Sequence, residues 1–368
     1  MTTQQLYREA MKLNIIIFIS ILTVLTSCNG QTNTQTHNSE KLNKLFPAGD
    51  TVKELSNNIM VIYQDRKNNY WFGSWQDGLY KYNGKSIIHY TEKDGLAAKR
   101  VEEIKEDRQG NIYFNTTEGL FQYNGNSFSK LTETISSEHD WKLNPDDLWF
   151  KGIEYSGYVY RFDGDNLYKL KFPKTELGED YIQKHPNYPN PYAVYCIYKD
   201  SKQNIWFGTA TLGVCRFNGK SFDWISEQDV TEIHDGPANG VRSIAEDKNG
   251  DFWFNTEYRY TIYDNKQDNG TFYNRIKSIG NLDGKDNSNL NEYLSITKDN
   301  DNNLWFATYS AGVWKYDGTK ITHYPVQLNS KDITLFSIYN DNNGKLWLGT
   351  HENGVFKFNG QTFNKFTL

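Results

Sequence analysis

One short motif recurs seven times after about residue 50, and this repetition constrains the fold more than any other feature of the chain. It begins with Ile-x-x-Asp, continues over five residues of turn type, and ends on an aromatic residue that opens a second apolar run. The six regular copies are Ile62/Asp65/Trp71, Ile104/Asp107/Tyr113, Ile197/Asp200/Trp206, Ile244/Asp247/Trp253, Ile296/Asp299/Trp305 and Ile338/Asp341/Trp347. A degenerate third copy holds Trp141 and Trp149, with a turn one residue shorter. The aromatic residues lie 36 to 57 residues apart, near the period of propeller blades.

Each copy contains four short apolar or alternating runs separated by turn residues, which predicts a four-stranded meander. In the fifth copy these runs cover residues 241–246, 252–256, 261–264 and 271–276. Asn-Gly and Asp-Gly pairs supply the positive φ of tight hairpin turns, and they end at Gly84, Gly125, Gly164, Gly219, Gly318 and Gly360. One meander alone has two open edges and too little core. The sequence therefore predicts an all-β fold, a seven-bladed β-propeller of four-stranded antiparallel blades, with the recurring Trp or Tyr packed between blades.

Three details follow from the alignment of the seven copies. The first and last copies look complete, so we expect the ring to close without a strand exchanged between the termini. Residues 45–54 are a candidate for an extra edge strand. Cys196 and Cys215 fall on the first and third strands of one blade, about 9–10 Å apart, which exceeds the reach of a disulfide. We therefore predict two buried free thiols.

The N-terminus has the features of a targeting segment rather than of a folded element. Lys12 precedes an apolar run over residues 15–25, which is the size of a signal-peptide core and about half the length needed to span a bilayer. The run ends in Leu-Thr-Ser-Cys at Cys28, which resembles the lipobox of bacterial lipoproteins. That resemblance implies cleavage before Cys28 and acylation of this residue. The alternative is an ordinary secretory signal with an incidental cysteine.

We accordingly predict a lipoprotein signal peptide over 1–27, starting at Met1 or Met11, a flexible polar tether over 28–50, and the propeller over 51–368. The membrane is then a partner through the N-terminal lipid. Asn29 follows the acylated cysteine, and by resemblance to bacterial lipoproteins the lack of Asp there favours the outer membrane. The expected location is extracytoplasmic, on the outer membrane and facing the periplasm.

The repeats resemble those of the two-component regulator propeller family. The resemblance rests on the pattern Ile-x-x-Asp-x-x-Gly/Asn-x-x-Trp-Phe-Gly-Thr, followed by Gly-Val/Leu-x-x-Tyr/Phe-Asn/Asp-Gly, and it covers roughly residues 56–368. In that family such propellers often form the periplasmic sensing part of hybrid histidine kinases. The sequence carries no kinase or receiver motif after its last repeat. The resemblance therefore implies a stand-alone, lipid-anchored, sensor-type module that binds a ligand or partner without catalysis.

The candidate binding face follows from the topology of a meander. The second-to-third and fourth-to-first connections share one face, and long connections there rim the central channel. The long fourth-to-first connections cover residues 132–140, 173–192, 227–240 and 277–292. Connection 173–192 carries Tyr181, His185 and Tyr188 among prolines, which suits contact with a glycan, a peptide or a protein, although a plain surface insertion has the same composition. A specialised side of the ring is expected between the third and fifth blades.

Some short second-to-third connections carry side chains able to bind a ligand where other copies have small residues. Arg100 and Arg242 begin innermost strands and are expected to face the channel mouth. Any one of these residues is also typical of a solvent-exposed channel rim, so the prediction of a binding site rests on their occurring together. The ligand-binding candidates are Trp75, Arg100, Glu118, Glu154, Tyr155, Tyr181, His185, Tyr188, Arg242, Glu257, Arg259, Tyr309, His351 and Glu352.

The competing interpretation is an enzyme similar to streptogramin lyases, which are propellers with metal and acid/base residues on this face. Shared chemistry would require at least two of His139, His234, His351, Glu118, Glu154 and Glu257 to lie within about 5 Å of each other. No metal-ligand spacing such as His-x-x-x-His occurs in the sequence, so we expect neither a metal nor a cofactor. A formal net charge of −5 and a pI near 5.9 argue against nucleic acid as a partner.

Overall fold

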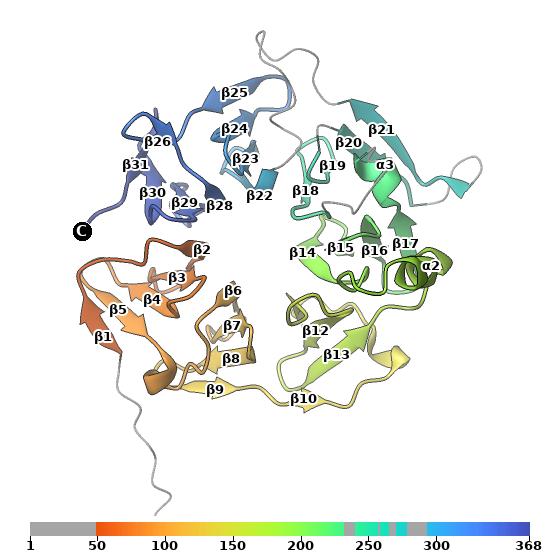
Figure 1. The fold of residues 1–368 in the computed structure, drawn as a ribbon, viewed down its shortest axis with the longest axis horizontal. Coiled ribbons are helices and arrows are strands. Elements are labelled where there is room, and N and C mark those ends of the chain that lie inside the picture. Colours follow the sequence, from red (N-terminus) through yellow and green to blue (C-terminus); the bar gives the residue numbers. More distant parts are fainter. Residues whose placement is uncertain (1–48, 232–239, 257, 265–269, 278–292) are drawn as a thin grey trace, which may run out of the picture. The chain divides into compact units, whose positions relative to one another are not determined.

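Seven blades, six built on a four-stranded antiparallel sheet and the third on a four-stranded sheet with one parallel pair, form a ring in the unit Leu45–Leu368 (Figure 1). The computed structural model describes residues 49–231, 240–256, 258–264, 270–277 and 293–368. The chain is therefore an all-β, seven-bladed β-propeller, and the fold predicted from the repeats is confirmed. The signal peptide and nearly all of the tether lie outside the described residues.

In the regular blades the strands run in chain order from the channel outward. Blade one holds β2 (Ile59–Gln64), β3 (Tyr70–Ser74), β4 (Leu79–Tyr82) and β5 (Ile87–Tyr90), and blade two holds β6 (Val101–Glu106), β7 (Ile112–Thr116), β8 (Gly119–Tyr123) and β9 (Phe128–Lys130). Blade four holds β14 (Val194–Lys199), β15 (Ile205–Thr209), β16 (Val214–Phe217) and β17 (Phe222–Ile225), and blade five holds β18 (Ala245–Glu246), β19 (Asp251–Trp253), β20 (Tyr258–Ile262) and β21 (Tyr273–Lys277). Blade six holds β22 (Tyr293–Lys298), β23 (Leu304–Thr308), β24 (Val313–Tyr316) and β25 (Ile321–Tyr324), and blade seven holds β28 (Leu335–Asn340), β29 (Leu346–Thr350), β30 (Val355–Phe358) and β31 (Phe363–Lys365).

Additional elements decorate this frame. Strand β1 (Asp50–Val52) pairs antiparallel with β5, which confirms the extra edge strand in blade one. The hairpin β26 (Gln327–Leu328) and β27 (Lys331–Asp332) joins blades six and seven. The helices are η1 (Glu92–Asp94), η2 (Glu138–Asp140), α2 (Glu176–Lys184) and α3 (Glu227–Thr231). In blade five, β20 begins three residues before the predicted run 261–264, because the β19–β20 hairpin pairs Trp253 with Arg259.

The third blade departs from the predicted meander. Its inner edge is β11 (Leu148–Lys151), followed by β12 (Tyr158–Phe162) and β13 (Leu167–Lys171), and β10 (Glu133–Thr134) pairs in parallel with β13 on the outer edge. The first strand that the sequence predicts around Trp141 is absent from this described segment, so that detail of the prediction is wrong. In the shorter turn Asn144 stands where the regular copies have Asp, and its side-chain amide donates to Asp147 Oδ2 at 3.1 Å instead of accepting bonds from the turn as the Asp carboxylates do.

In the six regular copies the side chain of the recurring Asp accepts hydrogen bonds both from the turn after the inner strand and from the aromatic residue of the second strand. We call this arrangement the clasp. The Oδ1 atom of Asp200 accepts hydrogen bonds from the backbone N–H groups of Lys202 (3.0 Å) and Asn204 (2.7 Å), and its Oδ2 atom accepts from Trp206 Nε1 (2.8 Å). The same Oδ2–indole bond measures 2.9 Å at Asp65, 3.1 Å at Asp247, 2.8 Å at Asp299 and 2.8 Å at Asp341, and the Tyr113 hydroxyl replaces the indole at Asp107 (2.9 Å). The clasp explains why Asp and an aromatic residue recur six positions apart.

The clasped aromatic rings fill the space between blades, as the repeat predicts. Trp206 is fully buried, and its ring centroid lies 4.6 Å from that of Phe252 in the next blade. Trp253 likewise packs against Phe306 at 5.2 Å, and Trp71 against Phe114 at 5.3 Å. Each blade therefore depends on the next for burial of its largest side chain.

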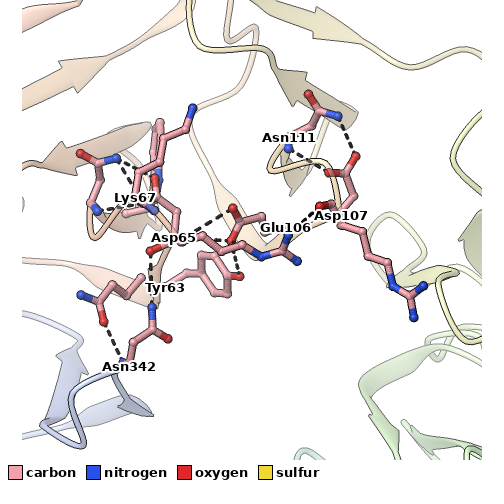
Figure 2. Close-up of polar contacts among 12 residues, drawn as sticks. Tyr63, Asp65, Lys67, Glu106, Asp107, Asn111 and Asn342 are labelled. Atoms are coloured by element: carbon pink, nitrogen blue, oxygen red, sulfur yellow. Dashed lines mark hydrogen bonds and ion pairs between the residues drawn. The ribbon is translucent and has the colours of Figure 1, made fainter.

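In three of the six regular copies the residue before the Asp links neighbouring blades through a second contact (Figure 2). Its side-chain oxygen accepts a hydrogen bond from the backbone N–H that follows the Asp of the preceding blade. The pairs are Glu106 with Arg66 (3.1 Å), Gln64 with Asn342 (2.7 Å) and Glu246 with Ser201 (2.8 Å). Because Gln64 belongs to blade one and Asn342 to blade seven, this contact also closes the ring without any exchanged strand.

The Gly of the Trp-x-Gly sequence is required where adjacent blades approach most closely. A Cβ atom on Gly349 would lie 2.4 Å from the backbone oxygen of Ile59 in blade one. A Cβ atom on Gly208 would lie 2.4 Å from the backbone oxygen of Val241 in blade five. A side chain at either position would force the inner strands apart.

Both cysteines of the propeller are free thiols, as predicted. Cys215 is buried, whereas Cys196 is half-buried and its Sγ donates to the backbone oxygen of Val241 at 3.4 Å. Both lie opposite β15, Cys196 on β14 and Cys215 on β16, so one strand separates them. Burial raises the pKa of the Cys196 thiol to about 12, which keeps it protonated.

Among the helices in the described part of the chain, none has the length and apolar character needed to cross a membrane.

Candidate ligand-binding cavity

A cavity of about 600 Å³ opens where the seven blades meet, and every blade contributes to its wall. This volume is within the range of small-molecule sites. The wall combines aromatic rings, three cationic side chains and two carboxylates. The lining residues are Met60, Val61, Trp75, Arg100, Glu102, Lys151, Gly152, Glu154, Tyr155, Val194, Tyr195, Arg242, Leu294, Ser295, Tyr309, Phe336 and Ser337.

One column of the repeat supplies much of this wall. The fifth residue before the clasp Asp lines the cavity in all six regular copies, as Met60, Glu102, Tyr195, Arg242, Leu294 and Phe336. In five of these copies the same residue is skipped in the ladder between the first and second strands, as in a β-bulge. A bulge re-aims the side chain of its extra residue, so the backbone irregularity directs this column into the cavity.

Arg100 is the centre of a polar and aromatic cluster across blades one, two, three and seven. Its guanidinium carbon lies 3.7 Å from the ring centroid of Trp75, which in turn stacks on Phe336 at 5.8 Å. Its two terminal nitrogens contact Glu154 Oε1 at 2.7 Å and Glu102 Oε1 at 2.8 Å. The guanidinium is thus fixed by stacking and by two carboxylates, which leaves it preorganised and electrically compensated.

Arg242 repeats the stacking but not the charge pairing. Its guanidinium carbon lies 4.4 Å from the ring centroid of Tyr195. Among the described residues no carboxylate forms an ion pair with Arg242. Burial raises the pKa of the Tyr195 hydroxyl, and the positive charge of Arg242 opposes that rise. Arg242 therefore presents an exposed cation on an aromatic support.

The irregular third blade shapes one side of the cavity. With β11 as its inner edge, this blade reaches the cavity through Lys151 and the loop that carries Glu154 and Tyr155. Lys151 Nζ lies 3.5 Å from Glu102 Oε2. Tyr155 is 56% exposed and has a φ of 49°, a left-handed conformation that is uncommon for a residue with a bulky side chain. Such backbone strain is often found where a side chain is held for function.

The structure gathers six of the predicted site residues in the cavity wall. Those in the wall are Trp75, Arg100, Glu154, Tyr155, Arg242 and Tyr309. His351 lies just behind it, with its ring 5.0 Å from that of Phe336 and its Nδ1 3.4 Å from Glu352 Oε1. Glu118 is an exposed residue on the β7–β8 connection outside the lining set, and Glu257 lies outside the described residues.

Two further predictions about placement need correction. Arg259 belongs to strand β20 rather than to a connection, and it donates to the Tyr316 hydroxyl at 3.0 Å, so it links blades five and six. Tyr181, His185 and Tyr188 contact one another on and after α2 and do not line the cavity, with ring distances of 4.6 Å and 5.4 Å along the series. The sequence missed Glu102, Lys151, Tyr195 and Phe336, three of which belong to the column before the clasp Asp and were identifiable from it.

The acid/base residues of the enzyme interpretation do not assemble in the described part of the chain. Glu154 pairs with Arg100 and His351 with Glu352, while His139 lies on η2 and Glu118 on blade two. No hydrogen bond or ion pair joins any two of these four candidates, and His234 and Glu257 are not described. No group of three or more His, Cys, Asp or Glu residues that would suit a metal ion occurs among the described residues.

A larger groove of about 950 Å³ lies away from the cavity, between the outer edges of blades three and four. Its wall includes Trp141, whose ring packs at 4.8 Å from Phe222 and at 5.3 Å from Phe217. These rings belong to the core cluster that joins the two blades, with Trp141 partly buried against it. The groove is on the side of the ring where the sequence predicts specialisation. Its wall is also charged, with Glu133, Glu138, Lys169, Lys171, Lys174 and Lys220, but it is lined by residues of blades three and four and of the segment between blades two and three, whereas all seven blades contribute to the cavity.

Comparison with known proteins agrees with this fold. The extracellular domain of BT4673 from B. thetaiotaomicron, assigned to a hybrid two-component system, superimposes with a TM-score of 0.57 at 19% identity, over 83% of this chain and 39% of that one. The corresponding domain of BT3049 from the same organism gives 0.53 at 18% identity, over 83% and 40%. Virginiamycin B lyase from Staphylococcus aureus gives 0.56 at 15% identity, over 84% and 97%. At these identities the similarity shows the fold alone, and the chain spans about 40% of the length of the two extracellular domains.

No curated protein matches the sequence. The two-component regulator propeller repeat matches residues 53–76, 187–211, 235–258, 287–310 and 327–352. These segments fall in blades one, four, five, six and seven and include the clasp Asp of each. The second and third blades both lie outside the matched segments. Five segments of the chain thus match the repeat of the two-component regulator propeller family.

Proposed function

We propose that this propeller is an extracytoplasmic binding module, of the sensor type, whose central cavity holds a small ligand without transforming it. The observation that carries the proposal is the convergence of preorganised cationic and aromatic side chains from all seven blades on one cavity of about 600 Å³. A few fixed polar groups within a largely apolar and aromatic wall are typical of ligand sites. The extracellular domains with a similar fold are consistent with this role.

The ligand contacts assigned by this proposal are Trp75, Arg100, Glu154, Tyr155, Arg242 and Tyr309, together with Glu102, Lys151, Tyr195 and Phe336. Stacking holds Arg100 and Arg242 in place before a ligand arrives, which lowers the entropic cost of binding. Glu154 is 48% exposed and Tyr155 56%, so both present polar groups to the cavity mouth.

A binding screen with the purified full-length chain tests the proposal. We expect a ligand from a panel of glycans and short peptides to bind, and Trp75→Ala to weaken that binding at least tenfold, about 1.4 kcal/mol, because Trp75 supports Arg100. Isothermal titration calorimetry measures the change. Arg108→Gln is the matched control, since Arg108 pairs with Asp146 at a turn that does not line the cavity. Equal affinities of wild type and Trp75→Ala for the ligand would place binding elsewhere.

We further propose that the module is tethered to the outer membrane, facing the periplasm, through a lipid on Cys28. The apolar run over 15–25 followed by Leu-Thr-Ser-Cys supports this location. We expect Cys28→Ala to abolish incorporation of radiolabelled palmitate and to release the protein from the membrane pellet.

Fractionation of the cell envelope, with the label followed by autoradiography, measures both effects. Cys196→Ala is the control, because Cys196 lies within blade four and is expected to leave labelling unchanged. Continued labelling of the Cys28→Ala protein would show that Cys28 is not the acylated residue.

A further inference from the structure

Among the described residues of the cavity wall, cationic side chains outnumber carboxylates by three to two. The wall contains Arg100, Lys151 and Arg242 against Glu102 and Glu154. Glu154 contacts Arg100 only, and Glu102 contacts both Arg100 (2.8 Å) and Lys151 (3.5 Å). Both carboxylates of the wall therefore pair with Arg100 and Lys151. Among the described residues of the wall, Arg242 is the cation without a carboxylate partner, in a chain whose formal net charge is −5.

The surroundings of Arg242 keep its guanidinium available. Its guanidinium carbon lies 4.4 Å from the ring centroid of Tyr195, and the residue as a whole is exposed. A guanidinium has a planar fork of N–H donors that matches a carboxylate in two parallel hydrogen bonds. Stacking on an aromatic ring fixes the plane of that fork.

Arg100 and Arg242 differ in whether a carboxylate of the described chain pairs with the guanidinium group. Both guanidinium groups stack on an aromatic ring of the cavity wall, Trp75 for Arg100 and Tyr195 for Arg242. Arg100 forms ion pairs with two carboxylates of the chain. Arg242 has the same geometry without a carboxylate among the described residues.

We infer that the ligand of the central cavity carries a carboxylate and that Arg242 binds it. This inference rests on the proposed function, because it names the chemical class that the same cavity recognises. The carboxylate of the ligand forms an ion pair with Arg242, as Glu154 does with Arg100. Tyr155 and Tyr309, which are exposed side chains of the wall, contact the adjoining part of the ligand. A neutral analogue of the same ligand would leave the cation unpaired and would bind more weakly.

The test uses pairs of probes that differ in a carboxylate alone. One arm compares oligogalacturonides with their methyl esters, and the other compares tripeptides with their C-terminal amides. Each is titrated into the full-length wild-type chain and into Arg242→Gln, Arg242→Lys and Arg108→Gln. The arms separate an acidic sugar from a peptide as the source of the carboxylate.

We expect the acid of at least one pair to bind about tenfold or more tightly than its neutral partner, the scale of a charge-assisted bidentate contact. Arg242→Gln should remove this preference, and Arg242→Lys should keep part of it, because lysine retains the charge but not the planar fork. Arg108→Gln should behave as wild type. The melting temperature should be the same for wild type and Arg242→Gln, since the inference requires that Arg242 not be paired within the chain.

Three results would overturn the inference. If a ligand binds and Trp75→Ala weakens it, but acid and neutral forms bind equally, the cavity is a binding site and Arg242 is not a carboxylate receptor. If the preference for the acid survives in Arg242→Gln, another group provides it. If no probe of either arm and no member of the general panel binds, the proposed function fails together with the inference.

Discussion

Replacing Trp206 with alanine is expected to destabilise the propeller by about 3–5 kcal/mol, the range for truncation of a buried large aromatic residue. Trp206 is fully buried, contacts Phe252 of the next blade at 4.6 Å and donates to Asp200 Oδ2 at 2.8 Å. The substitution therefore opens a cavity between blades four and five and removes one arm of the clasp. Chemical unfolding in urea, followed by tryptophan fluorescence and circular dichroism, measures the loss.

Trp206→Phe separates the two contributions. It keeps most of the ring but loses the indole donor, so it should cost about 1–2 kcal/mol, the order of one lost hydrogen bond to a charged group. Trp75→Ala is the matched control, because Trp75 is only partly buried, in the β3–β4 connection at the cavity, whereas Trp206 is fully buried. It should cost clearly less than Trp206→Ala. Similar losses for Trp75→Ala and Trp206→Ala would mean that the clasped rings are not the main support of the ring.

Breaking the ion pair of the third blade is the second change with a large expected effect. Arg161 Nε lies 2.5 Å from Asp147 Oδ2, and the two side chains are 3% and 2% exposed. Arg161 also donates to the backbone oxygen of Asp140 at 2.9 Å, so it connects the irregular segment to β12. Asp147→Ala leaves a buried guanidinium without its carboxylate and should cost about 3–5 kcal/mol. Urea unfolding at low and high salt measures the loss, which should change little with salt because the pair is buried.

The double substitution Asp147→Ala/Arg161→Met provides the control. Replacing a buried pair with apolar residues is often nearly neutral, since neither charge is then left without a partner. We therefore expect the double variant to be more stable than Asp147→Ala alone. Strictly additive losses from Asp147→Ala and Arg161→Met would contradict a direct interaction between the two side chains.

The recurring unit was enough to predict the blade count because each part of it has a local cause. The Asp accepts hydrogen bonds from its own turn, the aromatic residue six positions later donates to it, and the Asn-Gly turns hold Gly at positive φ, as at Gly84 (89°) and Gly360 (101°). All three depend on residues close together in the sequence. The extra strand β1 and the separation of the two cysteines followed from the same register.

The third blade shows where sequence periodicity stops being informative. Trp141 and Trp149 have nearly the spacing of a regular copy, but Asn144 replaces the clasp Asp, and the segment before Trp141 pairs at the outer edge of the blade as β10. The buried ion pair of this blade joins Arg161 on β12 to Asp147, which lies just before β11, and no spacing rule identifies it.

The sequence by itself determined the number of blades and, in the six regular blades, the strand order and the end of the inner strand that faces the cavity, because repetition encodes local hydrogen bonding. Only the tertiary structure decided which side chains meet there. The repeat position that forms the wall holds Met, Glu, Tyr, Arg, Leu and Phe in successive copies, so residue type does not identify it as a cavity position. A bulge in the strand ladder directs these side chains inward. The pairing of Arg100 with Glu154, 54 residues apart, and the absence of such a partner for Arg242 among the described residues, depend on the closure of the ring.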